Sequence, residues 1–390
     1  MFNIILLGFT SLFTDISSEM VYPLIPLFLA SLGAGPAVLG VIEGVAESLA
    51  SLLKVFSGYI ADRAGKRKGL TLAGYFSSAV GKVILSLASG WGTVLCARTV
   101  DRLGKGIRTA PRDALIAEST APARRGRAFG LHRGMDTAGA VIGVGAAYLI
   151  IAGGNRDYTR VFLLSVIPAF IGAALLFWLK EPPRVERVEP ARPVFRWSVL
   201  PKNLRLFLAV ALVFSLGNSS NAFLLLRSSG AGHSPGEVLL LYLAYNVSYM
   251  LLSYPAGRLS DRLGRKLVLV CGYAIYGSVY LGFALFDPAQ QTWLPWVLFV
   301  LYGVYSGLTD GVEKALVTDL APQNVRVTAI GVHAMITGIG LLPASLLAGL
   351  LWAGWGPAAP FIFGGVLGLA AAAGLAMILR DGTSSSLPAL

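Results

Sequence analysis

Acidic side chains lie inside segments that are otherwise apolar, and their types and spacing suit proton transfer. Asp15 and Glu19 lie four residues apart in the first apolar segment, and Glu43 and Glu47 lie four apart in the second. Residues four apart share one face of a helix, so the carboxyl groups of each pair would be neighbours. Two carboxyl groups in one site of low dielectric constant do not easily both ionise, so one tends to keep its proton. We predict that these four residues carry protons; the alternative is that they form fixed hydrogen bonds or ion pairs.

A row of basic side chains follows in segment 91–118. Arg98, Arg102, Lys105 and Arg112 fall on one stripe at helical spacing, with Asp101 close beside it. An arginine next to one of the carboxyl groups above would favour its charged form, and an anionic substrate could displace that pairing. We therefore assign Arg102 to proton coupling, and Arg98 and Asp101 to substrate binding.

Polar and aromatic side chains in later apolar segments complete the candidate substrate site. Such groups around a cavity suit an organic substrate with both apolar and polar parts. These further candidates are Arg133, Asp136, Asn218, Asn221, Tyr242, Asn246, Tyr305 and Asp310. We interpret His132 as a polar contact at the cytoplasmic end of its helix, with a proton relay as the alternative.

The sequence around these residues has the composition of a membrane protein. Hydrophobic residues make up 55% of the 390 residues, charged residues only 13%, and the mean hydropathy is +0.69. A charge near the bilayer centre costs at least about 2.5 kcal/mol, so each charged residue named above needs a partner or a wet cavity. At about 20 residues per span, the length accommodates about twelve helices, and we predict an all-α integral membrane protein. The predicted spans are 4–32, 38–61, 70–88, 91–118, 127–152, 160–179, 204–226, 235–259, 267–286, 293–320, 325–352 and 357–379.

The chain is predicted to divide into two halves. Residues 181–202 hold several prolines and mixed charge, so they are interpreted as a cytoplasmic linker. Residues 1–180 would form an N-terminal bundle of six helices, residues 203–380 a C-terminal one, and residues 381–390 a disordered tail.

The net charge of +12 lies mostly in short loops on one side of the predicted membrane. By the positive-inside rule, both termini are then cytoplasmic, and we expect a multi-pass protein of the plasma membrane, the inner membrane in a bacterium. Because the excess charge is a topology signal, we expect the lipid bilayer and no nucleic acid as a partner. Cys96 and Cys271 lie in apolar runs with no disulfide or metal spacing.

A short basic motif occurs twice between apolar segments. Residues 58–70 read GYIADRAGKRKGL and residues 257–269 read GRLSDRLGRKLVL. A glycine-assisted turn followed by basic residues suits a helix that leaves the membrane on the cytoplasmic side, and two copies imply two equivalent halves. We assign a gating role to Gly58, Asp62, Arg63, Gly65, Arg67, Arg112, Asp113, Asp261 and Arg262. In this interpretation Lys105 and Arg108 also reach the cytoplasmic surface.

The motif resembles the signature G-x-L-a-D-R-x-G-r-k of the major facilitator superfamily, whose members are secondary transporters. Arg102-x-x-x-Gly106 resembles in part a second pattern of that family, R-x-x-x-G-x-g-x-A, whose arginine is associated with proton coupling; here Arg108 replaces the second glycine. A glycine series in 127–152 resembles the family's antiporter motif but lacks its Gly-Pro pair. The resemblance implies twelve transmembrane helices in two pseudo-symmetric six-helix bundles, with the substrate cavity between the halves.

These observations lead to one expected function and two alternatives. We expect a monomeric secondary transporter, not an enzyme, without cofactor or metal, that works by alternating access and exchanges protons for an exported small organic compound. Tyr242 and Asn246 align with Glu43 and Glu47, so titratable chemistry would be concentrated in the first half. The alternatives are a transporter of an organic anion or phosphate ester held by helix 4 and 5 arginines, and an exporter of a divalent metal cation.

Overall fold

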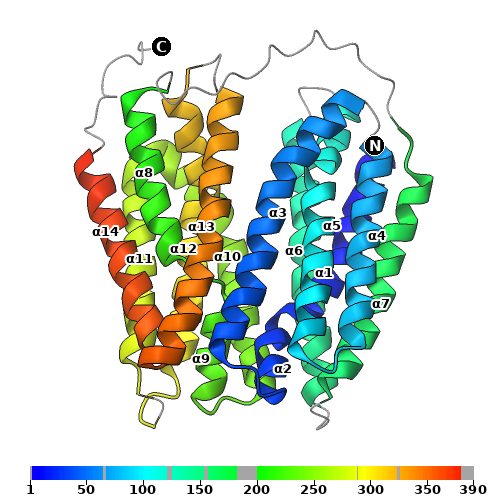
Figure 1. Ribbon diagram of the computed structural model, residues 1–390. Helices are drawn as coiled ribbons and strands as arrows, with labels where there is room; N and C mark the ends of the chain where they lie inside the picture. The colour runs from blue at the N-terminus through cyan, green and yellow to red at the C-terminus, as the bar shows by residue number, and fades with distance from the viewer. Residues whose placement is uncertain are drawn as a thin grey trace.

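The computed structural model describes residues 2–64, 67–120, 125–152, 157–181, 200–287, 289–322 and 326–378. Every regular element in these ranges is helical (Figure 1). The elements are α1 (Phe2–Val21), η1 (Tyr22–Leu24), α2 (Ile25–Ser31), α3 (Pro36–Ala64), α4 (Arg67–Ser86), α5 (Trp91–Glu118), α6 (Arg125–Ala152), α7 (Tyr158–Leu175), η3 (Leu176–Trp178), α8 (Lys202–Gly217), α9 (Ala222–Gly230), α10 (Pro235–Leu263), α11 (Arg265–Leu285), α12 (Leu294–Leu320), α13 (Arg326–Trp355) and α14 (Ala359–Ile378).

These elements make an all-α integral membrane protein, as predicted. Because α1 and α2 are parts of one interrupted helix, and α8 and α9 of another, the fourteen α-helices form twelve helical segments. Nine segments in the described residues are long and apolar enough to cross a membrane by length and composition. The predicted helix 91–118 coincides with α5, whereas the predicted helix 4–32 is interrupted at η1. Pro23 and Pro26 explain the interruption, since proline has no N–H to donate.

The helices form two bundles that repeat one arrangement, α1 to α7 and α8 to α14 (Figure 1). In the first, α1 packs against α6 and α7, and α3 against α5; in the second, α8 packs against α13 and α14, and α10 against α12. Between the halves, α3 packs against α13, α6 against α10, and α2 against α9. The start of α1 and the end of α14 lie at one end of the molecule, which we call the terminal end, and α2 and α9 lie at the other, the far end (Figure 1).

Glycines bring α6 close to α1. A Cβ atom on Gly139 or Gly143 would meet the carbonyl oxygens of Leu12 and Ile16, so the two backbones touch where larger side chains cannot fit. This contact places one acidic face of α1 directly against α6. The predicted tail 381–390 and most of the predicted linker lie outside the described residues.

Candidate functional site

A buried ion pair joins α3 to α5 and reaches the second half. Arg98 donates hydrogen bonds from Nε and Nη2 to Glu43 at 2.7 to 3.0 Å, and the two residues are 2% and 0% exposed. Each lies seven residues from the far end of its helix, about 10 Å at 1.5 Å per residue. The Ser220 hydroxyl, from the second half, donates to Glu43 at 3.0 Å and lies 3.2 Å from the Tyr22 hydroxyl. The predicted proton carrier Glu43 thus joins the halves near the far end.

Further ion pairs continue from this one. Glu47 pairs with Arg102 at 3.0 Å and lies 3.8 Å from Arg98; Asp101 pairs with the buried Lys82 at 3.1 Å and also lies 3.8 Å from Arg98. Three acids and three bases therefore balance one another. We call this set the first-half charge cluster: Glu43, Glu47, Lys82, Arg98, Asp101 and Arg102. Its arginines, predicted to serve substrate binding and proton coupling, already have carboxylate partners.

Asp15 and Glu19 have different surroundings. Tyr242 of the second half donates a hydrogen bond to Glu19 at 3.0 Å. Asp15 faces α6, where a Cβ on Gly139 would lie 3.2 Å from the Asp15 Cβ and where Asp136 is a charged neighbour. Both residues are partly exposed, and within the described part of the chain no basic side chain forms an ion pair with either. These two carboxyl groups therefore differ from those of Glu43 and Glu47, each of which pairs with an arginine.

Asp136 gathers polar partners from its own helix and from α1. It accepts a hydrogen bond from the Ser11 hydroxyl, and its carboxylate lies 3.7 Å from His132 Nδ1 and 3.9 Å from Arg133 Nη1. His132 is buried, so it contacts these neighbours rather than solvent. Ser11 lies four residues before Asp15, so the predicted substrate ligand Asp136 contacts the face of α1 that carries Asp15.

A second polar link crosses between the halves in α6, α10 and α12. Arg133 donates to the Tyr249 hydroxyl at 2.7 Å, Tyr249 donates to Asp310 at 2.8 Å, and Arg133 Nη2 lies 3.8 Å from Asp310. Lys314 also donates to Asp310, at 3.3 Å. The Arg133 and Asp310 side chains are 61% and 50% exposed. Because charged groups are costly in lipid, side chains that are this exposed are expected to face water between the halves.

Tyrosine and amide side chains of the second half bond mainly to one another. Tyr302 donates to Asn221 at 2.8 Å, and Asn218 donates to the Tyr305 hydroxyl at 3.4 Å. Asn246 donates to a carbonyl oxygen of its own helix. The Tyr302 and Tyr305 rings contact each other, with their centroids 5.2 Å apart. The structure therefore brings three candidate substrate residues of the second half into one group of contacts: Asn218, Asn221 and Tyr305.

The break between α8 and α9 leaves backbone carbonyl groups without helical donors, and tyrosines satisfy them. Tyr276 donates to the Gly217 carbonyl at 2.8 Å, and the Tyr280 hydroxyl lies 3.5 Å from the Ser219 carbonyl. Both tyrosines are fully buried. A backbone polar group in a membrane must be satisfied internally, so these rings help to maintain the break.

The second half also holds ionisable side chains that contact one another. Glu313 accepts a hydrogen bond from Tyr273 at 2.9 Å and lies 3.3 Å from His333 Nε2, whose ring stacks on Phe207. These four side chains come from α12, α11, α13 and α8, so spacing along the chain could not show that they meet.

The repeated basic motif makes a similar contact in each half, from adjacent positions of the motif. Arg67, at the start of α4, pairs with Glu118 at the end of α5; Arg265, at the start of α11, pairs with Asp319 at the end of α12 at 3.2 Å. Arg265 also lies 2.5 Å from Asp261. The motif therefore ties the beginning of the third helix of each half to the end of the fourth.

The other predicted gating residues have varied outcomes. Arg112 pairs with its neighbour Asp113 at 2.9 Å, and Arg262 is exposed. Arg108 instead packs over the Tyr75 ring, 4.3 Å from its centroid. Gly65 lies outside the described residues, as do the surroundings of Gly58 and the side chains of Asp62 and Arg63.

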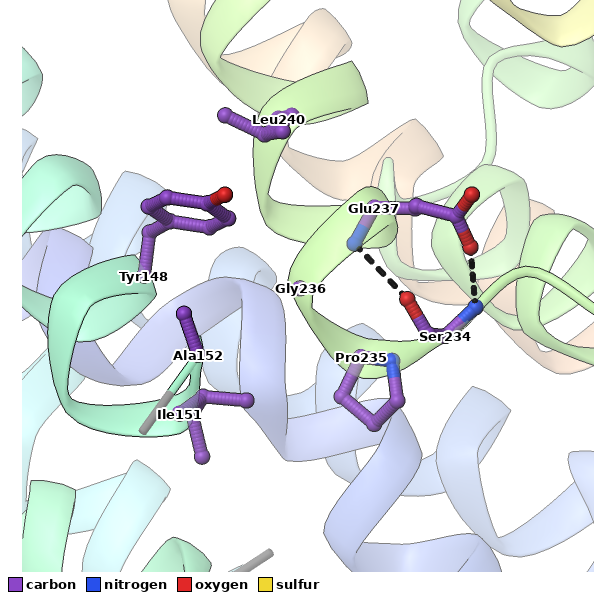
Figure 2. Close-up of a pocket in the computed structure, with 8 residues that line it drawn as sticks. All are labelled: Tyr148, Ile151, Ala152, Ser234, Pro235, Gly236, Glu237 and Leu240. Carbon is purple, nitrogen blue, oxygen red and sulfur yellow. Dashed lines mark hydrogen bonds between the residues drawn. The ribbon is translucent and has the colours of Figure 1, made fainter. Parts of the chain in front are cut away.

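A cavity of about 300 Å³ lies between α6 and the start of α10, near the far end (Figure 2). Its walls are Tyr148, Ile151, Ala152, Leu240 and residues 234–237. Ser234 and Glu237 bond to each other in a capping box, and Figure 2 shows the Glu237 carboxylate turned towards the Ser234 backbone. Ser234 and Glu237 are thus each other's partners, and none of the residues that line the cavity belongs to the charged groups described above.

Two residues of the first-half charge cluster and its surroundings, Lys82 and Tyr22, were not found from the sequence. Lys82 has the signal that identified Asp15, a charge inside an apolar segment, and the same criterion would have found it. Tyr22 carries no such signal, because a tyrosine in a membrane helix is ordinary until its partner is known, whereas Ser220 stands in the polar run 218–221.

An internal polar site between two repeated helical bundles defines a class of protein, the polytopic membrane transporters. The family model described as Major Facilitator Superfamily matches residues 7–229 and 206–389, and the chain belongs to this superfamily. The expected family is therefore confirmed.

The chain also resembles individual proteins. It is 38% identical to an uncharacterized MFS-type transporter of Methanocaldococcus jannaschii over 94% of this chain and 92% of the relative. It is 26% identical to multidrug resistance protein MdtH of Edwardsiella ictaluri over 82% of this chain and 79% of that protein. Among solved structures, the nucleoside transporter NupG superposes with a TM-score of 0.78 at 12% identity, covering 97% of this chain and 99% of that one. This last likeness concerns the fold alone.

Proposed function

We propose that the protein is a proton-coupled antiporter that exports a small organic compound by alternating access. It would lie in the plasma membrane, which is the inner membrane in a bacterium, with both termini in the cytoplasm. The observation that carries this proposal is the contrast between two kinds of carboxyl group. Glu43 and Glu47 are neutralised by arginines, whereas Asp15 and Glu19 have no ion-pair partner among the described residues. A carboxyl group in a membrane helix that has no cation within ion-pair distance can lose its charge by binding a proton.

Protonation can then be linked to the position of the halves. Glu19 bonds to Tyr242 across the interface, so a change in its charge alters a contact between the two moving bodies. A proton that binds one arrangement better than the other shifts the equilibrium towards it. The relationship to MdtH supports export rather than uptake, and the aromatic and amide side chains of the second half support an organic cargo.

The two alternatives have less support. The organic-anion alternative depended on Arg98, Arg102 and Arg133, of which the first two are occupied by carboxylates. Arg133 remains partly exposed, so Arg133→Gln tests this alternative by the loss of organic-anion binding. For a divalent cation, the described residues contain no group of three or more His, Cys, Asp or Glu side chains placed to hold a metal.

Reconstituted vesicles with an imposed pH gradient test the proposal. A panel of fluorescent cationic, neutral and anionic organic compounds would identify a transported probe. Asp15→Asn and Glu19→Gln should abolish gradient-driven movement of that probe but leave exchange of probe for probe without a gradient. Asp287→Asn, a loop carboxylate at the surface, is the control and should behave as the parent. Unchanged gradient-driven transport in both site variants would refute proton coupling through these residues.

A further inference from the structure

The polar contact between Glu43 and Ser220 must break when the far end opens. Glu43 belongs to the first half, and Ser220 lies in the break between α8 and α9 of the second. Ser220 is held in place by its own half as well, because its backbone N–H donates to Ser345 Oγ of α13 at 3.3 Å. When the halves separate at this end, Ser220 therefore leaves with the second half.

The rest of the charge cluster stays with the first half. Arg98 holds both carboxylate oxygens of Glu43, so Glu43 keeps its counter-ion after Ser220 has left. Only a hydroxyl is exchanged, and water that enters the opening can replace it. Without Arg98, returning the Glu43 carboxylate from water to its buried position would leave a buried charge with no counter-ion, which is strongly unfavourable.

Lys82 determines how firmly Arg98 is held on Glu43. Arg98 has a second acid nearby, Asp101, whose Oδ2 lies 3.8 Å from Arg98 Nη1. Lys82, 4% exposed, bonds to that same oxygen at 3.1 Å and contributes no contact to Glu43 or to Ser220. Because Lys82 neutralises Asp101, Asp101 competes less for the Arg98 guanidinium.

We propose that Glu43 and Ser220 form a latch that closes the far end, and that Lys82 is a positioning residue that keeps Arg98 on the latch carboxylate. The latch rests on the proposed function only in that the two halves alternate. It requires neither protons nor any particular cargo. Lys82 acts through Asp101 and Arg98 and does not touch the moving half.

Distances between spin labels at the far end test this proposal. In a Cys96→Ala and Cys271→Ala background, nitroxides at Ser89→Cys and Gln290→Cys report the separation of the α4–α5 and α11–α12 loops by double electron–electron resonance. Ser220→Ala removes a hydrogen bond to a charged group, so the population with the longer distance should rise roughly tenfold. Ser220→Thr keeps the hydroxyl, and Ser219→Ala alters a neighbouring serine that contacts Tyr280 of its own half; both should match the parent.

A charge-balanced pair of variants tests Lys82. Lys82→Met should also increase the population with the longer distance. The double variant Lys82→Met with Asp101→Asn lacks the competing acid as well, so its distance distribution should return to that of the parent. The double variant also covers the case in which Lys82→Met alone fails to fold. An unchanged distribution in Ser220→Ala would overturn the latch. A double variant that still shows the longer distance would overturn the role of Lys82. Because the labels report the halves and not transport, a protein that moves no probe under a pH gradient would still answer this test.

Discussion

The Tyr242 hydroxyl donates a hydrogen bond to Glu19 at 3.0 Å, and the two residues belong to opposite halves of the molecule. Tyr242 is buried, whereas Glu19 is partly exposed. This bond lies between α10 and α1, and the Arg133–Tyr249–Asp310 link likewise connects α6 with α10 and α12. The interface therefore combines a carboxyl group bonded to a neutral donor with a hydrated charged pair.

The Tyr242–Glu19 bond predicts non-additive variants. Tyr242→Phe should reduce gradient-driven transport, because it removes the hydroxyl whose hydrogen bond joins Glu19 to the second half. Glu19→Gln combined with Tyr242→Phe should be no worse than Glu19→Gln alone, since residues that act through one contact do not add. Initial transport rates of the parent, the two single variants and the double variant measure this. Fully additive losses would contradict the assigned link.

Unequal effects on stability are expected from the two α3 carboxylates. Glu43→Gln leaves the buried Arg98 charge unbalanced, and breaking a buried pair in this way destabilises a protein by about 3–5 kcal/mol. Glu47 has a side chain that is 28% exposed, so water can compensate part of the loss in Glu47→Gln. The midpoint of thermal unfolding in detergent should thus fall further for Glu43→Gln. Equal midpoints would show that burial does not govern these pairs.

A methyl group tests the close contact between α1 and α6. Gly143→Ala places a Cβ against the Ile16 carbonyl and should lower stability by about 1–3 kcal/mol through forced separation of the helices. Gly145→Ala is the control in the same helix, because nothing lies within 4 Å of a Cβ at that position. Thermal unfolding of the two variants side by side distinguishes packing from helix propensity. A control as unstable as Gly143→Ala would refute the contact.

The fold follows from local features of the sequence. Apolar runs of the right length, proline and glycine at their ends and a motif in two copies were enough to predict twelve helical segments and their pairing into halves. Helix α5 was predicted to its terminal residues because Gly90 precedes it and its basic stripe keeps helical spacing throughout. These signals depend on neighbours in the chain, which is why they could be read without coordinates.

Ion-pair partners were harder to predict, because they depend on how helices rotate against one another. Spacing placed Arg98 and Arg102 on one stripe and Glu43 and Glu47 on another, but it could not match them. The structure pairs Arg98 with Glu43 and Arg102 with Glu47, and leaves Lys105 exposed on the same stripe. Lys82 belongs to α4, whereas the basic stripe lies on α5.

The tyrosines that cap the break between α8 and α9 affect how mutational scans of this protein should be interpreted. Tyr276 donates its hydroxyl to the Gly217 carbonyl, so Tyr276→Phe removes one of the two donors of that oxygen inside the bilayer and leaves the Ser219 N–H at 3.1 Å as the other. A drop in activity at this position would report damage to the scaffold. Counting it as loss of ligand recognition would draw the boundary of the binding site too wide.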